Sequence, residues 1–307
     1  MRVLVTGASG HIGSAVVPEL LGAGHQVVGL ARSDTSAAAL EAAGAEVVRG
    51  ELDDLDGLSA GAASADGVIH LAFKHEAMQA GDFLGAVTAD LAAIEAIGAA
   101  LEGSEKPFVS TGGTLMLAFS GITGRPGTEQ DVVAAGPRVD AENAVVAMAE
   151  RGVRSSIVRL PPLVHSTLDH HGFGPTLIGI AREQGFAGYI GDGSNRWPAV
   201  HTLDAARAYR LALESAPAGS RLHVVAEEGV AFREIAAAIA RQLGVGSRPV
   251  GAEDVAGYFS FLAPFVSLDN PTSNELTREL LGWEPTHPGL IEDLEDGHYF
   301  AGDSASS

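Results

Sequence analysis

The stretch Val3-Leu4-Val5-Thr6-Gly7-Ala8-Ser9-Gly10-His11-Ile12-Gly13 decides the fold. Its first residues are apolar and predict a buried strand, and the glycines that follow predict a turn into a helix. That helix has an apolar face, because Ala15, Val16 and Leu20 recur at helical spacing after Ile12. A strand, a glycine-rich turn and a helix in this order are typical of the first unit of a dinucleotide-binding domain.

The three glycines of the turn fall at positions 7, 10 and 13, and each has a predicted steric role. The first permits a tight turn, the second lets the backbone approach a pyrophosphate, and the third lets the helix pack closely on the strand. A diphosphate would bind the amide groups at the N-terminus of the helix. The predicted cofactor-binding residues of the turn are therefore Gly7, Ser9, Gly10, His11, Ile12 and Gly13.

The composition narrows the class of protein. The net charge is −20, from 19 Lys+Arg against 39 Asp+Glu. The negative electrostatic field of such a chain repels nucleic acid and anionic membranes. The chain has no cysteine, so disulfides, thiolate nucleophiles and cysteine metal sites are excluded. We find no apolar run of about 18 residues and no signal peptide before the first strand. The sequence therefore predicts a cytoplasmic protein with a small-molecule substrate, and with neither a nucleic-acid nor a membrane partner.

Strand and helix patterns alternate over the first half of the chain. Apolar runs predict strands at 26–31, 46–49, 67–72, 107–111 and 153–160, and helical patterns lie between them, notably at 91–101 and 139–151. This alternation predicts an α/β fold, the Rossmann type of doubly wound parallel sheet.

The second half predicts a smaller, substrate-capping part. Residues 164–200 are rich in glycine and histidine and show few helical periods, so they resemble an insertion rather than another unit of the sheet. A helix at 202–214, a strand at 221–225 and a helix at 232–243 follow. We therefore predict a dinucleotide-binding domain at 1–165 that returns through about 196–225, and a cap at 166–195 and 226–307, with Leu281 and Trp283 in the cap.

The end of the second strand favours NADP(H) over NAD(H). Proteins that prefer NAD place an acid there, whereas this chain has Arg32 and Ser33, which suit a 2′-phosphate. The alternative is that Arg32 is a solvated surface charge and Asp34 binds the ribose. Further predicted cofactor contacts are Glu51 and Leu52 at the adenine, and Leu71 and Ala72 after the fourth strand.

By these features the chain resembles the short-chain dehydrogenase/reductase superfamily, in the extended or atypical branch related to nucleotide-sugar epimerases. The resemblance covers nearly the whole length. It is carried by Thr6-Gly7-Ala8-Ser9-Gly10-His11-Ile12-Gly13, Val68-Ile69-His70-Leu71-Ala72, Val158-Arg159-Leu160-Pro161-Pro162, Ala199-Val200-His201-Thr202-Leu203-Asp204 and Leu280-Leu281-Gly282-Trp283-Glu284-Pro285. It implies that Pro161, Pro162 and Leu163 face the nicotinamide, and that substrate lies between the sheet edge and the cap. Dimers are common in the superfamily, which leaves a homodimer open.

The chain departs from the resemblance at the catalytic dyad. Reductases of the superfamily place a Tyr four residues before a Lys, but no register of the segment 134–142 supplies both. In one register, Arg138 and Glu142 stand at the two positions. In the register that we favour, Glu142 matches an acid beyond the Lys, Arg138 replaces the Lys and Ala134 replaces the Tyr. The usual Ser position falls on Gly112, which leaves the hydroxyls of Thr111 and Thr114 beside it.

Histidines are the alternative proton donors, because imidazole titrates in the useful pH range. His165 and His171 are candidate catalytic residues, together with Thr111, Thr114 and Arg138. His75 is a candidate for the substrate pocket, and His201 is expected to make a structural bond, with Asp204 as its candidate partner. A metal site at His170 and His171 is not predicted. Phe173, Tyr189 and Trp197 are candidate pocket walls, with core packing an equal alternative for each.

We therefore predict an NADPH-dependent reductase that acts on a small apolar carbonyl or cyclic imine without the usual Tyr. An imine can enter already protonated, so it needs no strong acid in the site. The alternative is a catalytically silent NADP-binding regulator or redox sensor. A sugar-nucleotide epimerase or dehydratase is the weaker hypothesis, because its chemistry starts with a strong base at the Tyr position.

Overall fold

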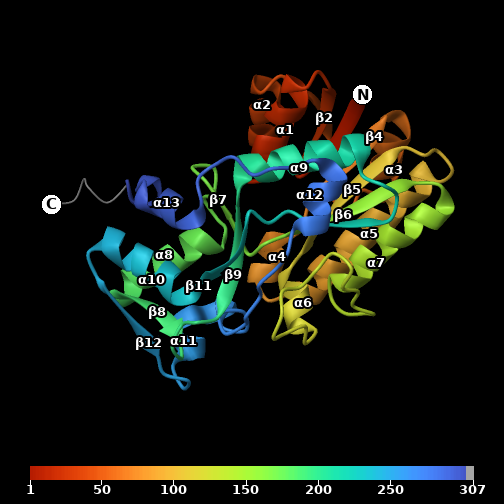
Figure 1. The fold of residues 1–307 in the computed structure, drawn as a ribbon. Coiled ribbons are helices and arrows are strands. Elements are labelled where there is room, and N and C mark those ends of the chain that lie inside the picture. Colours follow the sequence, from red (N-terminus) through yellow and green to blue (C-terminus); the bar gives the residue numbers. More distant parts are fainter. Residues whose placement is uncertain (302–307) are drawn as a thin grey trace.

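Seven parallel strands form the central sheet of the computed structural model, which describes residues 1–301 (Figure 1). In spatial order they are β10 (Ser220–His223), β6 (Arg154–Leu160), β5 (Pro107–Gly113), β4 (Gly67–His70), β1 (Arg2–Thr6), β2 (Gln26–Ala31) and β3 (Glu46–Arg49). The strand order runs outward in both directions from β1 and β4, so the sheet is doubly wound. The predicted Rossmann-like α/β fold is confirmed.

Helices cover both faces of this sheet (Figure 1). The strands alternate their side chains between the faces, so Val3 and Val5 join one core while Leu4 joins the other. The first face carries α1 (Gly13–Gly22), α2 (Asp34–Ala42), α9 (Thr202–Ser215) and α12 (Glu275–Leu281). The second carries α3 (Leu55–Ser64), α5 (Phe83–Leu101), α7 (Val139–Ala147) and η1 (Met148–Arg151). Two short helices, α4 (His75–Gln79) and α6 (Leu115–Phe119), follow β4 and β5.

One described helix, α5, has the length and mean hydropathy of a membrane span. Its residues Ala86, Ala93, Ile94 and Ile97 are buried, and it packs against α3 and α7. The same composition is typical of a core helix in a doubly wound fold.

The cap is a second body with its own core. It contains α8 (Phe173–Gln184), α10 (Phe232–Leu243), α11 (Val255–Phe259), η2 (Ser260–Leu262), α13 (Leu290–Glu295) and η3 (His298–Phe300). Strands β8 (Phe186–Ile190) and β12 (Gly246–Val250) pair in parallel, and β11 (Glu227–Ala231), β9 (Arg196–His201) and β7 (Leu163–His165) form a three-stranded sheet. Trp197, Phe232 and Phe259 lie at the centre of the cap core.

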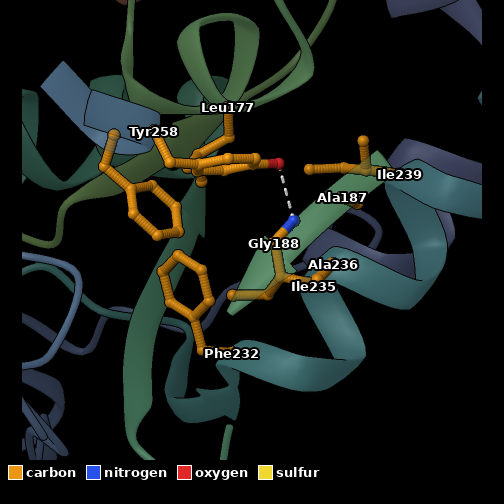
Figure 2. Close-up of a pocket in the computed structure, with 9 residues that line it drawn as sticks. Leu177, Ala187, Gly188, Phe232, Ile235, Ala236, Ile239 and Tyr258 are labelled. Atoms are coloured by element: carbon orange, nitrogen blue, oxygen red, sulfur yellow. Dashed lines mark hydrogen bonds between the residues drawn. The ribbon is translucent and has the colours of Figure 1, made fainter. Parts of the chain in front are cut away.

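A small void lies inside the cap core (Figure 2). Its volume is about 10 Å³, which is room for about one water molecule. The Tyr258 hydroxyl accepts a hydrogen bond from the Gly188 amide at 2.8 Å and donates to the Phe186 carbonyl at 2.6 Å. Because a Cβ at Gly188 would stand 2.7 Å from the Tyr258 ring, that ring requires glycine beneath it. The void is a feature of core packing and not a ligand site.

Two expectations are wrong in the second half. Residues 164–200 contain a regular helix, α8, whose buried residues Leu177, Ile178 and Ala181 have helical spacing among the glycines. Leu281 and Trp283 pack with α1 and α9 in the first sheet core instead of the cap, and the Trp283 indole N–H donates to the Asp204 carbonyl at 3.0 Å. Residues 302–307, for which the small and polar composition predicts a frayed tail, lie outside the described residues.

Candidate functional site

The glycine turn is shaped by close contacts between backbone segments. Gly7 has φ +65°, and a Cβ there would stand 2.7 Å from the Ala72 amide nitrogen. A Cβ at Gly13 would stand 2.3 Å from the Gly7 carbonyl oxygen, so the predicted roles of both glycines in packing are confirmed. Gly10 is exposed, and a Cβ there would meet only the Gly7 oxygen, at 3.3 Å. The exposed turn and the N-terminus of α1 therefore fit a diphosphate.

The side chain of His11 connects the glycine turn to residues that follow β7 and begin α9. Its Nε2 lies 2.8 Å from the Thr202 hydroxyl, and its Nδ1 lies 3.6 Å from a carboxylate oxygen of Asp169. Burial and the neighbouring His170 and His165 lower the pKa of His11 to about 4, so the ring is neutral at physiological pH. The backbone of His11 belongs to the turn, but its side chain is engaged away from the turn.

A buried chain of polar groups joins β1, β4 and α5 beneath the site. The Thr6 hydroxyl accepts from the amides of Leu71 and Ala72, both at 3.2 Å, and lies 2.8 Å from His70 Nδ1. Thr6 therefore donates to Nδ1, which leaves the proton of His70 on Nε2, where it is donated to Asp90 at 3.2 Å. The predicted contacts Leu71 and Ala72 thus lie directly beside Gly7.

Four charged side chains gather at the ends of β2 and β3. The Arg32 guanidinium lies 2.6 Å from the Glu76 carboxylate, and Arg49 lies 2.7 Å from Asp34. Arg49 also donates to the Ser33 carbonyl at 2.5 Å, while the Ser33 hydroxyl caps α2 by accepting from the Ser36 amide. Arg49 was not among the predicted cofactor contacts, although a cation at the end of the third strand is a signal visible in the sequence.

The predicted adenine contacts divide between core and surface. Leu52 packs into the core with α3 and is 8% exposed, whereas Glu51 is exposed. Asp53 beside them binds Lys74 through both carboxylate oxygens, at 2.5 and 2.7 Å. This ion pair connects the segment after β4 with the segment after β3.

Arg138 is fixed at the C-terminal edge of the sheet. Its guanidinium donates to the Thr111 carbonyl at 3.1 Å, lies 3.7 Å from the Asp90 carboxylate and stacks over the Phe73 ring at 4.1 Å. The buried Asp90 oxygen that faces it has no hydrogen-bond partner among the described residues. Ligands of open α/β sheets bind at this edge, so Arg138 occupies a position suited to cofactor or substrate.

Glu142 on α7 and Arg138 at its N-cap have different environments. Glu142 is buried and binds Arg159 at 2.5 and 2.9 Å and Arg221 at 2.9 Å, so it is not available to a ligand. The helix begins at Val139, and Ala134 lies in the exposed loop before it. No tyrosine stands in this loop or on α7.

Both candidate hydroxyls are engaged within the protein. The Thr111 hydroxyl donates to the His70 carbonyl at 2.9 Å and lies 2.8 Å from the hydroxyl of the buried Tyr209. Thr114 is fully buried and accepts from the Asn270 amide at 2.9 Å. Because Thr114 points into packed structure and the half-buried Thr111 is held by two internal hydrogen bonds, the geometry opposes the predicted catalytic role of either one.

The candidate histidines lie in different environments. His165 is buried and paired with Asp293 at 2.9 Å, whereas His171 is exposed beside His170, with ring centroids 6.3 Å apart. His75 is exposed and packs edge-on against Phe73 at 5.1 Å, next to Arg138. Desolvation and the charge of Arg138 lower the pKa of His75. Of His75, His165 and His171, His75 is the one beside the Arg138 guanidinium.

The expected bond between His201 and Asp204 is absent. His201 instead accepts from the Leu203 amide at 3.3 Å and stacks on His287 at 4.6 Å, and Asp204 binds His287 at 3.0 Å.

In residues 1–301, no group of three or more His, Asp or Glu residues is arranged to hold a metal ion.

An aromatic cluster bridges the two bodies of the molecule. Phe119 at the end of α6 meets Phe265 at 5.3 Å, and Phe173 meets Phe265 at 5.8 Å and Phe261 at 6.2 Å. Phe119 is 47% and Phe261 39% exposed. Trp197 is fully buried and Tyr189 packs on the cap core, so the core interpretation holds for these two residues.

The segment after β6 leads from the sheet toward this cluster. Pro161 and Leu163 are buried and Pro162 is half-buried, and the Leu160 carbonyl accepts from the Thr114 amide at 2.9 Å. Leu163 opens β7 and belongs to the cap core. The three residues predicted to face the nicotinamide therefore join the sheet to the cap.

Comparison with known proteins places the chain in a family. The model of the NAD-dependent epimerase/dehydratase family matches residues 3–95. Proteins described as uncharacterized, from Schizosaccharomyces pombe and Saccharomyces cerevisiae, are 47% and 42% identical to it, over 98% and 96% of this chain and 100% and 98% of theirs. The dTDP-glucose 4,6-dehydratase DesIV of Streptomyces venezuelae, solved with NAD, is 19% identical with a TM-score of 0.78, over 99% of this chain and 98% of that one. Residues 3–95 therefore match the NAD-dependent epimerase/dehydratase family, the whole chain has the fold of this dehydratase, and over nearly its full length it belongs to one family with the two yeast proteins.

Proposed function

We propose that the chain is an NADP(H)-dependent oxidoreductase that reduces a small apolar carbonyl or cyclic imine. The match of residues 3–95 to the NAD-dependent epimerase/dehydratase family, together with the fold shared with a dehydratase solved with NAD, supports a nicotinamide dinucleotide as cofactor. The choice of NADP(H) is supported by Arg32 and Arg49, which flank Ser33 where the adenosine ribose of such a cofactor binds. Arginine suits this purpose because its planar fork matches a phosphate.

The observation that carries the proposed chemistry is the position of Arg138 at a site where α7 and the loop before it carry no tyrosine. When bound, the cofactor supplies the hydride. A guanidinium stays charged at physiological pH, so Arg138 can attract a developing negative charge but cannot release a proton. An iminium carbon needs no such proton, whereas an ordinary ketone oxygen does. We therefore expect C=N bonds or activated ketones to be the better substrates.

The aromatic cluster supports an apolar substrate. Phe119, Phe173, Phe261 and Phe265 offer ring faces and edges at the junction of the sheet and the cap. Exposed aromatic surface at such a junction favours an apolar or aromatic ligand.

A redox sensor that binds NADP(H) without turnover is the second candidate. It is favoured by the engagement of the three predicted donors Thr111, Thr114 and His165 in internal hydrogen bonds. Epimerase or dehydratase chemistry on a sugar nucleotide ranks below both. That chemistry begins with removal of a hydroxyl proton, and neither Arg138 nor the neutral His75 beside it is a strong base.

The deciding experiment measures NADPH and NADH consumption with matched panels of cyclic imines and activated ketones. Turnover with NADPH, faster on imines than on ordinary ketones, is the expected result. Tight NADPH binding without turnover on either panel would favour the sensor. An Ala134→Tyr variant adds a candidate acid before α7, and it should raise ketone rates more than imine rates. An equal effect on both panels would contradict the account based on the missing acid.

A further inference from the structure

Two ion pairs connect the segment after β4 to the ends of the first strands. Arg32 and Glu76 meet in a forked contact, with nitrogen-to-oxygen distances of 2.6 and 3.4 Å. Lys74, two residues before Glu76, binds both carboxylate oxygens of Asp53. These contacts join residues that are 44 and 21 positions apart in the sequence, at the end of the site where the adenosine ribose binds.

Glu76 occupies the Arg32 guanidinium, which is the group on which recognition of the 2′-phosphate would depend. A guanidinium binds carboxylate and phosphate through the same planar fork, so the two anions compete for one set of donors. The Arg32 and Glu76 side chains are 66% and 79% exposed. Exposed pairs are weak, so a phosphate can displace the carboxylate.

Displacement does not remove the carboxylate from the neighbourhood. Glu76 lies in the first turn of α4, and the Lys74–Asp53 contact holds the preceding residues close to β3. The displaced negative charge would therefore stay near the bound phosphate, which carries a charge of about −1.5 to −2. The ribose of NAD(H) instead presents a neutral hydroxyl, which can donate a hydrogen bond to a carboxylate.

We propose that Glu76 is an internal competitor for the 2′-phosphate, and that it lowers the preference of this chain for NADP(H) over NAD(H). The inference rests on the proposed NADP(H) cofactor and deepens it by naming the residue that limits cofactor selectivity. Arg32 favours the phosphate, Glu76 opposes it, and the balance between them sets the selectivity.

The test uses binding, not turnover, with adenosine 2′,5′-bisphosphate and adenosine 5′-monophosphate as probes in isothermal titration calorimetry. Glu76→Gln removes the charge while keeping the size and a hydrogen-bonding amide. This variant should bind the bisphosphate about 5- to 10-fold more tightly than the wild type, because one like charge near a dianion is removed. Binding of the monophosphate should be unchanged or weaker. At about 0.5 M salt the gain should shrink, because exposed charges are screened.

A matched control is Glu102→Gln, which breaks another exposed ion pair, between Glu102 and Arg151. This variant should bind both probes as the wild type does. Unchanged or weaker bisphosphate binding by Glu76→Gln would overturn the proposed competition.

The two hypotheses fail in different ways. If the wild type prefers the bisphosphate and Arg32→Ala loses that preference, but Glu76→Gln gains nothing, only the role of Glu76 is wrong. If neither the wild type nor Glu76→Gln prefers the bisphosphate, both the NADP(H) proposal and the competitor role are wrong.

Discussion

At the scale of single residues, Arg138 combines an unfavourable backbone conformation with three specific side-chain contacts. Its φ is +67°, a left-handed conformation that costs a residue with a side chain about 1–2 kcal/mol. The Thr111 carbonyl, the Asp90 carboxylate and the Phe73 ring together hold the guanidinium. Such strain persists only where the surrounding structure fixes the residue, and it is concentrated at functional sites.

Arg138 should be needed for turnover through its charge. We expect Arg138→Ala to lower kcat/KM for activated ketones about 100-fold, the size of effect seen when one electrostatic stabiliser of the transition state is removed, because negative charge develops on a ketone oxygen and not on an iminium nitrogen. Arg138→Lys should retain more activity, because it keeps a cation without the planar stack on Phe73. Steady-state kinetics test this, with Arg125→Ala as a control, because Arg125 pairs with Asp131 in the loop that precedes α7. Equal rates for Arg138→Ala and the wild type would contradict the proposed role.

Gly13 should be intolerant of any side chain. Gly13→Ala places a Cβ 2.3 Å from the Gly7 carbonyl oxygen, so the turn or the helix must shift, and we expect a loss of about 2–4 kcal/mol in unfolding free energy. Urea denaturation measures it. Gly22→Ala, in the last turn of the same helix, meets nothing within 4 Å and should stabilise the chain by about 0.5–1 kcal/mol. Similar effects of the two substitutions would show that the predicted clash is not real.

At the scale of elements, polar side chains fasten the edge of the sheet where β10 pairs with β6. Arg159 binds Glu142 of α7 and lies 3.0 Å from His223 Nε2, while His223 Nδ1 lies 2.9 Å from the Ser273 carbonyl. Nδ1 therefore carries the proton of a neutral His223, and Nε2 accepts from Arg159. Protonation would place a second cation beside Arg159, so burial and this neighbour lower the pKa of His223 to about 3.

This arrangement predicts a loss of stability in mild acid. His223, His11 and His201 have pKa values lowered to about 3, 4 and 4, against 6.5 in the unfolded chain. The unfolded chain binds more protons as pH falls below 6.5, so stability declines from there toward about pH 4. Asp169 acts in the opposite direction, because burial raises its pKa to about 6 and its protonated form is favoured in the fold. The three histidines outweigh this one carboxyl, and the lowered pKa of His75 acts in the same direction as theirs, so acidification leaves a net loss of stability.

His223→Gln isolates the largest of these contributions. The amide can donate to Ser273 and accept from Arg159 without titrating, so this variant should lose about 2–3 kcal/mol less than the wild type between about pH 7 and 4.5. Urea midpoints at a series of pH values measure the difference. His171→Gln, at an exposed position, should follow the wild-type curve. A wild-type curve that is flat over this range would refute the argument.

At the scale of the whole molecule, the proposed substrate surface is formed where the two bodies meet. Phe119 belongs to the sheet domain, whereas Phe173, Phe261 and Phe265 belong to the cap. Figure 1 shows α6 and α11 on neighbouring edges of the two bodies. The contact between Phe119 and Phe265 is therefore an inter-body contact that no single element provides.

Phe119→Ala should weaken substrate binding and leave folding nearly unchanged. The side chain is 47% exposed, so its loss affects stability little, but it removes aromatic surface from the proposed pocket. We expect KM for an aromatic imine to rise about 5- to 10-fold, on the basis of about 1 kcal/mol of lost aromatic contact. Leu203→Ala, at a 42% exposed residue on α9, is the control and should leave KM unchanged. An unaltered KM in Phe119→Ala would place the substrate elsewhere.

The sequence by itself determined the doubly wound sheet and its glycine turn. Short-range patterns suffice for these features, because alternation of Val3, Leu4 and Val5 defines two buried faces and the spacing of three glycines meets steric limits within one turn. The absence of a Tyr–Lys pair and the adjacency of Arg32 and Ser33 were equally local, so they were readable without coordinates.

Only the tertiary structure decided which polar groups face the site. Thr111, Thr114 and His165 had the right chemistry, but their partners Tyr209, Asn270 and Asp293 are distant in the sequence and bind them in the interior. Likewise, Glu76 reaches Arg32, and Trp283 joins the sheet core, through contacts that depend on how the chain returns across the molecule. A side chain's availability depends on its nonlocal hydrogen bonds and burial, and sequence spacing does not encode either of these.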